Sequence, residues 1–138
     1  LIQQLLDYGA MAPNHKHTAP WRFRVFADEE RFEIATACAQ NEPEKTDFWR
    51  EKVQRAPVII GVASFIGRVN SALPAWEEHA ATAAACQNIL LAAHALGLGA
   101  IWRTGKPCDF PHVQQLFDGF DATAGDQVMA FIYVGWPQ

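Results

Sequence analysis

The sequence has few cysteines and few basic residues, and each shortage excludes a class of protein. Its three cysteines, Cys38, Cys86 and Cys108, are scattered and include no Cys-x-x-Cys pair, so neither a zinc ribbon nor a thioredoxin-type redox site is predicted. Eleven Lys and Arg residues stand against fifteen Asp and Glu residues, which gives a formal net charge of −4. Nucleic-acid binding requires a basic surface that neutralises phosphates, so we expect no nucleic-acid partner.

Signals for export and for membrane association are also missing. No charged segment followed by an apolar core opens the chain, and no run of basic residues suits an anionic membrane surface. The apolar stretch from Ala80 to Trp102 is the rival candidate for a membrane span, but Thr82, Gln87, Asn88 and His94 interrupt it. We therefore expect a cytoplasmic protein with reduced cysteines and no membrane partner.

The length and composition indicate a single domain over residues 1–138. Half of the 138 residues are hydrophobic, which is enough for a complete core. An amphipathic helical pattern starts directly at Leu1, and the last strand-like segment ends close to Gln138. We therefore expect a few further residues of the domain beyond both ends.

The hydrophobic patterns predict five helices and at least three strands, without an internal repeat or linker. Helices are expected at residues 1–10, 29–39, 47–55, 76–96 and 111–117, and strands at residues 21–26, 58–63 and 128–134. Asp28 and Asp109 are expected to cap two of the helices, Gly97 is expected to end the long one, and residues 101–106 are expected to form a loop. This pattern indicates an α+β domain with helices packed around a central sheet.

Residues 12–21, Ala-Pro-Asn-His-Lys-His-Thr-Ala-Pro-Trp, have the composition of a ligand-binding loop. The segment places polar donors between two prolines, at the junction of a predicted helix and strand. A metal site at His15 and His17 would need further ligands, and no carboxylate or cysteine lies nearby in the sequence, so no metal is predicted. A loop histidine bonded to the backbone is the alternative interpretation of His15.

Residues 97–105, Gly-Leu-Gly-Ala-Ile-Trp-Arg-Thr-Gly, form the second candidate segment. Glycines let a ligand approach the backbone closely, and the side chains of Arg103 and Thr104 can bind a phosphate. The glycine spacing matches neither a Walker loop nor a dinucleotide fingerprint. A surface ion pair for Arg103 and a core position for Trp102 are the alternatives. The residues alone predict an anion or cofactor site and no particular reaction.

Both segments resemble motifs of the nitroreductase family, and further motifs occur in the same order. Residues 12–23 resemble the family's early motif, in which a short loop joins a helix to a strand and ends in Pro-Trp, and residues 55–60 resemble its next strand. The Ala-rich helix with residues 97–105 looks like the flavin-proximal helix and loop, and residues 135–138 are similar to the closing Gly-x-Pro. Together these motifs span essentially the whole chain and look like those of the small NAD(P)H nitroreductases.

The resemblance implies a nitroreductase-like α+β fold with a central, mostly antiparallel sheet flanked by helices. It also implies an intertwined homodimer with one FMN at each of two interface sites, where His15 reaches the FMN that is bound mainly by the partner subunit. The FMN-binding residues implied are His15, Trp102, Arg103 and Thr104, together with Met11, Asn14 and Lys16; those on the nicotinamide side are Ala92, Ala93, His94, Ala95, Leu96 and Gly97. The family also uses an Arg-Ser-Arg-like cluster before its first helix and a basic residue after Gly-x-Pro, and this sequence contains neither.

The activity implied by the resemblance is reduction of nitro compounds, quinones or similar small acceptors with NADH or NADPH, by a ping-pong mechanism. FMN would carry the chemistry, so no catalytic side chain is expected, in agreement with the lack of paired carboxylates in the candidate segments. Two alternatives stay open. The first is a flavin enzyme of the same fold with other chemistry, such as dehalogenation or oxidative breakdown of the flavin, and the second is a flavin-binding dimer without catalytic activity.

Overall fold

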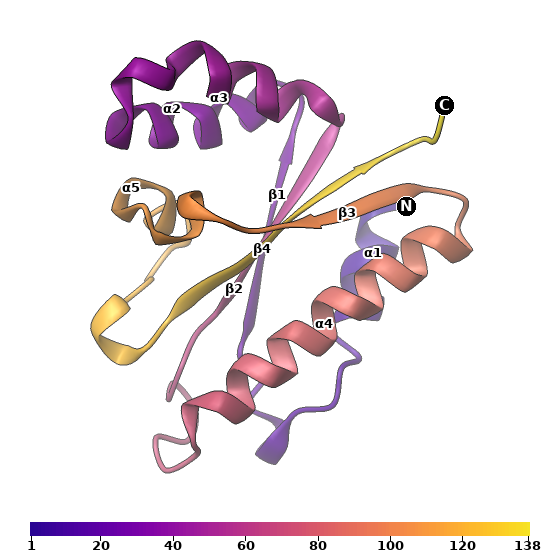
Figure 1. Ribbon diagram of the computed structural model, residues 1–138. Helices are drawn as coiled ribbons and strands as arrows, with labels where there is room; N and C mark the ends of the chain where they lie inside the picture. The colour runs from indigo at the N-terminus through magenta and orange to yellow at the C-terminus, as the bar shows by residue number, and fades with distance from the viewer.

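The computed structural model describes residues 1–138 and contains a four-stranded antiparallel sheet covered by helices (Figure 1). The helices are α1 (Ile2–Gly9), α2 (Arg31–Asn41), α3 (Thr46–Lys52), α4 (Ala75–Ala95) and α5 (Pro111–Gln114), and the strands are β1 (Trp21–Ala27), β2 (Val58–Ser64), β3 (Gly99–Arg103) and β4 (Gln127–Gly135). The connections include the 3-10 turns η1 (His15–His17), η4 (Val53–Arg55) and η5 (Lys106–Asp109). The strand order is β1-β2-β4-β3, so β1 and β3 are the edges of the sheet. The predicted α+β class and antiparallel sheet are confirmed.

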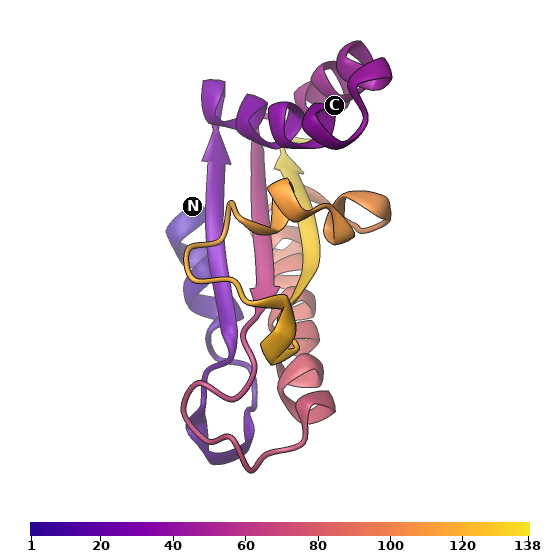
Figure 2. The same cartoon turned by 90° about the vertical axis from the view of Figure 1, so that its left-hand side faces the viewer.

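Alternate residues of the central strands divide the core into two halves. Ile60 and Val62 of β2 pack with α1 and α4, whereas Ile59 and Ala63 pack with α2, α3 and α5. Figure 2 shows this layering, with α5 in front of the sheet and α1 and α4 behind it. Both faces of β2 are therefore apolar, which explains why its sequence is a continuous apolar run rather than an alternating one.

Helix α4 is apolar nearly all round because it is packed on several sides. It lies against the sheet and against α1, and the two helices approach closely at Gly9. A Cβ atom at Gly9 would lie 2.9 Å from Cγ1 of Ile89, so only glycine fits there without a shift. The helix ends as predicted, with Gly97 in the left-handed region at a φ of 80°. No helix combines the length and apolarity needed to cross a bilayer.

The prediction of a loop at residues 101–106 is wrong for residues 101–103. Residues Gly99–Arg103 form edge strand β3, in which Trp102 pairs with Ile132 of β4. The segment is short and has glycine and arginine at its ends, so its sequence shows no alternating strand pattern. The strand forms because β4, which is distant in the sequence, pairs with it.

Both predicted aspartate caps are also wrong. Asp28 makes no capping hydrogen bond and has a φ of 51°, while the side chain of Glu30 accepts a hydrogen bond from the N–H of Ala27 at 3.2 Å. Asp109 lies inside the preceding turn η5, and Phe110 occupies the cap position of α5. In each case a 3-10 turn precedes the α-helix and moves its start beyond the aspartate.

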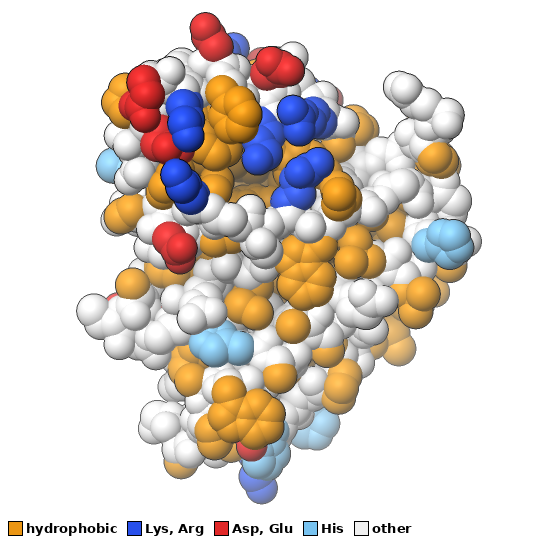
Figure 3. Space-filling view, viewed as in Figure 1, with side chains coloured by type: hydrophobic (Ala, Val, Ile, Leu, Met, Phe, Trp, Pro, Cys, Tyr) orange, Lys and Arg blue, Asp and Glu red, His pale blue; other side chains and the backbone are white.

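Charged side chains are unevenly distributed over the surface. Figure 3 shows Lys and Arg side chains gathered around hydrophobic side chains at the end of the molecule where α2 and α3 lie, with acidic side chains at the rim. The middle of the same face, where α4 and the sheet lie, is largely hydrophobic or uncharged. This end of the molecule therefore has a local basic surface even though the chain is acidic.

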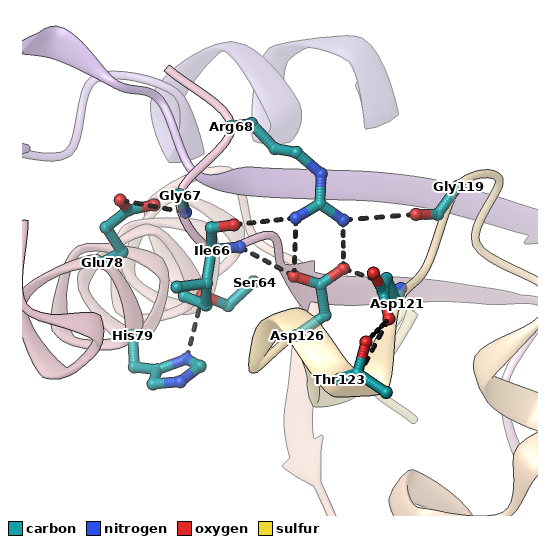
Figure 4. Close-up of polar contacts among 10 residues, drawn as sticks. All are labelled: Ser64, Ile66, Gly67, Arg68, Glu78, His79, Gly119, Asp121, Thr123 and Asp126. Atoms are coloured by element: carbon teal, nitrogen blue, oxygen red, sulfur yellow. Dashed lines mark hydrogen bonds and ion pairs between the residues drawn. The ribbon is translucent and has the colours of Figure 1, made fainter. Parts of the chain in front are cut away.

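A buried carboxylate holds together the loops that follow β2 and precede β4. Asp126 is 5% exposed and accepts hydrogen bonds from the N–H groups of Ile66 and Asp121, each at 2.8 Å. It also pairs with the guanidinium of Arg68, which donates to the carbonyls of Ile66 and Gly119 at 2.7 and 3.3 Å (Figure 4). Every partner in this network comes from a loop, so the network replaces the regular hydrogen bonds that these segments lack.

The variant Asp126→Ala should lower the free energy of unfolding by about 3 kcal/mol or more, because it leaves a partly buried guanidinium and two N–H groups without an acceptor. Urea denaturation measures the loss. The control Glu33→Ala removes the partner of the exposed Arg24–Glu33 ion pair, whose atoms are 2.5 Å apart, and should cost at most about 1 kcal/mol. Similar losses in both variants would contradict this assignment.

Candidate functional site

The loop between α1 and β1 is held in a strained conformation by Asn14. Its Oδ1 accepts a hydrogen bond from the N–H of Ala19 at 2.9 Å, and its Nδ2 donates to the carbonyl of Ala12 at 3.1 Å. Between these anchors Lys16, His17 and Ala19 all have positive φ values, at 58°, 54° and 43°. Non-glycine residues adopt such angles at a free-energy cost and tend to do so at ligand-binding and active sites.

His15 projects from this loop and is bonded to a carboxylate rather than to the backbone. Its Nδ1 lies 2.6 Å from Oε2 of Glu77, which belongs to the first turn of α4. Because Nδ1 already interacts with Glu77, Nε2 is the ring nitrogen that can form a hydrogen bond with another group, and it has no partner within the chain. The sequence offered no signal for Glu77, because 62 residues separate it from His15.

The two central residues of the second segment lie on opposite faces of β3. Trp102 is half-buried in the core half under α4, and its Nε1 donates to the carbonyl of Met129 at 3.0 Å. Arg103 lies on the other face, where its guanidinium is 5.4 Å from the ring centre of Tyr133. Burial raises the pKa of Tyr133, while the positive charge of Arg103 opposes this shift. Thr104 follows the strand and is exposed.

A groove of about 360 Å³ follows the outer edge of β3. This edge pairs with no other strand, so its free N–H and C=O groups are available to a ligand. The groove is lined by Gly99–Ile101 of β3, by Arg55 and Arg103, which supply positive charge, and by Trp136. Nε of Arg103 is buried and has no hydrogen-bond partner.

A second groove, of about 440 Å³, lies between α1 and α4. It is lined by Tyr8, Met11, Asn88, Leu91, Ala92, Ala95 and Leu96, of which only Asn88 is not hydrophobic. The groove thus brings Met11 together with three of the six residues that the resemblance places on the nicotinamide side. The other three lie elsewhere: Ala93 is fully buried in the core, His94 is exposed, and Gly97 forms the left-handed cap of α4.

Within one chain the two candidate segments do not form a common site. The His15 loop contacts the first turn of α4, whereas β3 begins only after the last turn of this 21-residue helix. A helix of this length spans about 30 Å, and Figures 1 and 2 show the loop at the end of the molecule opposite α2 and α3. The two segments can meet around one ligand only if they come from different copies of the chain.

Sequence reasoning missed the residues that complete both grooves. Tyr8 and Leu91 are large, apolar and exposed, and Asn88, Leu91, Ala92 and Ala95 share one face of α4 through their spacing of three and four residues. That spacing was a usable signal, but it was masked because α4 is apolar on its other faces too. Arg55 and Trp136 lie in two of the family motifs, but the sequence did not mark them as site residues, since only the sheet brings them next to β3.

The fold and these two grooves define an α+β domain with two concave surfaces, one along the open edge of a sheet and one between two helices. The chain belongs to the nitroreductase family, because the family model described as "Nitroreductase family" matches residues 1–136. The resemblance seen in the motifs is therefore confirmed.

Curated relatives of the chain carry related names. The Escherichia coli (strain K12) protein named "Putative NAD(P)H nitroreductase YdjA" is 34% identical over 143 residues, which cover 99% of this chain and 76% of that protein. The Bacillus subtilis (strain 168) protein named "Putative NAD(P)H nitroreductase YfhC" is 30% identical over 145 residues, which cover 99% of this chain and 73% of that protein.

Solved structures share the fold. A protein from Desulfovibrio desulfuricans described as a "putative nitroreductase in complex with fmn" has a TM-score of 0.73 and 30% sequence identity over 99% of this chain and 72% of its own. The nitroreductase-like family protein from Bacillus cereus has a TM-score of 0.80 and 24% identity, over 99% of this chain and 73% of its own. The second likeness concerns the fold alone.

The variant Asn14→Ala should loosen the His15 loop without unfolding the domain, because it removes the acceptor that holds Ala19 in place. One hydrogen bond contributes about 0.5–1.5 kcal/mol, so amide hydrogen exchange at Ala19 should become roughly two- to tenfold faster. Exchange in β2 should not change. The control Asn14→Asp keeps an oxygen acceptor and should retain most of the protection, and unchanged exchange in Asn14→Ala would rule out this role.

Proposed function

We propose that this chain is an NAD(P)H-dependent FMN oxidoreductase that reduces nitro compounds, quinones or similar small acceptors. The observation that carries the proposal is the groove along β3, where a free strand edge lies beside Arg103, whose buried Nε has no hydrogen-bond partner within the chain. Membership of the nitroreductase family and the FMN complex of the Desulfovibrio desulfuricans relative support this choice of cofactor.

The residues present suit the two chemically different parts of FMN. Its ring system has an edge of alternating donors and acceptors, which free N–H and C=O groups of a strand can match. Its phosphate needs cations, and Arg103 provides a guanidinium with spare donors, with the Thr104 hydroxyl next to it in the sequence. The groove volume lies within the range of about 300–1,000 Å³ that is usual for small-molecule sites.

When bound, FMN supplies the electron-transfer chemistry, as it can take a hydride from NADH or NADPH and reduce a second compound after the nicotinamide has left. The chain contributes position and shielding. Met11, Ala92, Ala95 and Leu96 form an apolar surface that would exclude water from the nicotinamide side. No acid–base pair is required of the protein, so no catalytic side chain is assigned.

The groove between α1 and α4 supports the proposal of a homodimer. Met11 and Leu91 are 74% and 61% exposed, and a contiguous apolar surface of this kind is typical of a protein interface. A second copy seated on this face would cover it and would bring Asn14, His15 and Lys16 of one chain toward Trp102, Arg103 and Thr104 of the other. We also propose a reducing compartment such as the cytoplasm, because the three cysteines are buried free thiols.

The purified protein should be yellow, or become yellow on addition of FMN, and Arg103→Ala should weaken FMN binding by about ten- to a hundredfold. Hydrogen bonds to a charged group contribute about 1.5–3 kcal/mol, which corresponds to this factor. Quenching of flavin fluorescence measures the dissociation constant. The control Arg50→Ala removes an equal charge from α3, where Arg50 lies over the ring of Phe32, and should leave FMN affinity unchanged.

A protein that stays colourless with added FMN would refute the proposed function. If FMN binds but NADH and NADPH do not bleach it, the chain is a flavin-binding protein without this activity. If the flavin is bleached, steady-state rates with nitroaromatics, quinones and halogenated phenols distinguish reduction of nitro compounds and quinones from dehalogenation.

The variant Leu91→Asp should convert the dimer to a monomer, because it places a charge in the centre of the apolar groove. Light scattering coupled to size-exclusion chromatography measures the mass, and FMN affinity should fall in parallel if the site is shared between subunits. The control Phe48→Asp changes a similarly exposed apolar side chain on α3, on the other side of the sheet, and should remain dimeric. A dimeric Leu91→Asp variant would place the interface elsewhere.

A further inference from the structure

Three basic side chains lie close together beside the groove along β3. Arg103 ends β3, Lys52 ends α3 and Arg55 ends η4. Arg103 lines a small cavity with Lys52 and the groove along β3 with Arg55, so it connects the other two. Lys52 belongs to α3, which lies at the end of the molecule where Figure 3 shows Lys and Arg side chains gathered.

None of these three cations has an anionic partner within the chain. Four other arginines are bonded to protein acceptors, among them Arg68 to Asp126 and Arg31 to the carbonyl of Ala56, whereas Arg50 lies over the ring of Phe32. Lys52, Arg55 and Arg103 form no ion pair and donate no side-chain hydrogen bond, and the buried Nε of Arg103 has no acceptor at all. Glu42, whose charge acts on Cys38 beside these cations, pairs through Oε2 with Lys45 at 3.1 Å, and its buried Oε1 has no hydrogen-bond partner.

The groups between the cations do not neutralise them. Burial raises the pKa of the Cys38 thiol to about 12, and burial also raises the pKa of Tyr133, so both side chains are uncharged at neutral pH. Burial lowers the pKa of Lys52, and the positive charges of Arg103 and Arg55 lower it further. The three cations therefore repel one another in the free chain, an arrangement that is typical of binding sites for anions.

We propose that Lys52, Arg55 and Arg103 bind a phosphate monoester group. Two guanidinium groups and one ammonium group suit a dianion with three terminal oxygens better than a carboxylate, which one arginine can satisfy. The groove that Arg55 and Arg103 line is also lined by the free edge of β3 and by Trp136, which is 66% exposed. The organic part of the ester thus has a strand edge to bond and an aromatic ring to stack on.

The phosphate monoester can belong to FMN or to the adenosine ribose of NADPH, or the ligand can be free phosphate. The proposal extends the proposed function by assigning Lys52 and Arg55 to phosphate binding. It rests on that function only where the phosphate belongs to FMN or NADPH. Binding of inorganic phosphate and of adenosine 2′-phosphate can be measured on the protein without any flavin. A failure of the proposed function is therefore distinguishable from a failure of this site.

The test compares Lys52→Gln and Arg55→Gln with the control Arg50→Gln at constant ionic strength. Calorimetric titrations use inorganic phosphate, adenosine 2′-phosphate, FMN and riboflavin, and circular dichroism checks that each variant is folded. Each of the two site variants should weaken binding of at least one phosphate ligand by about tenfold or more. Riboflavin binding should not change, and Lys52→Arg should retain the affinity because it keeps the charge.

The pattern of losses identifies the source of the phosphate. Loss for FMN but not for riboflavin assigns the site to the flavin phosphate, loss for adenosine 2′-phosphate assigns it to NADPH, and loss for inorganic phosphate alone assigns it to the free ion. Unchanged binding of all ligands in both site variants would overturn the proposal. An equal loss in Arg50→Gln would also overturn it, because the effect would then depend on net charge and not on this site.

Discussion

Burial of both faces of the two central strands is the constraint on which the rest of this structure depends. Strands β2 and β4 are apolar on both sides, so helices must cover the sheet above and below. Helices α1 and α4 cover one face of the sheet, and helices α2, α3 and α5 cover the other. None of these helices pairs with or replaces a strand at the outer edge of β3, so the backbone groups of this edge stay free.

The same packing explains why the candidate site is incomplete in a single chain. Helix α4 has to run along the whole sheet to cover it, so it separates the His15 loop at its first turn from β3, which follows its last turn. Its outer surface with α1 remains apolar and exposed at Met11 and Leu91. In an isolated chain the two candidate segments stay apart and the apolar surface stays exposed to water. A second copy seated on this surface would cover it and would bring the two segments together.

The buried or clustered charged groups differ in whether the chain supplies their partners. Asp126 is buried, and each of its acceptor positions is used by a loop, so it stabilises the fold. Lys52, Arg55 and Arg103 are the opposite case, with charges of one sign close together and no acceptor within the chain. Repulsion of this kind lowers stability in the free protein and is relieved when an anion binds, which is why such clusters indicate function more often than structure.

The sequence by itself determined the class of fold, most of the helices and strands, and the two segments with ligand-binding composition. These are local properties, since the apolar run at residues 58–63, the long Ala-rich helix and the glycine that ends it depend on residues close together in the chain. The family resemblance added the cofactor and the expected partner.

Only the tertiary structure decided that residues 99–103 form a strand, that Glu77 holds His15, and that Arg55, Trp136 and Lys52 lie beside Arg103. Each of these features depends on contacts between segments that are far apart in the chain. Such contacts are not reflected in the local hydrophobic periodicity of either segment, so the sequence pattern does not predict them.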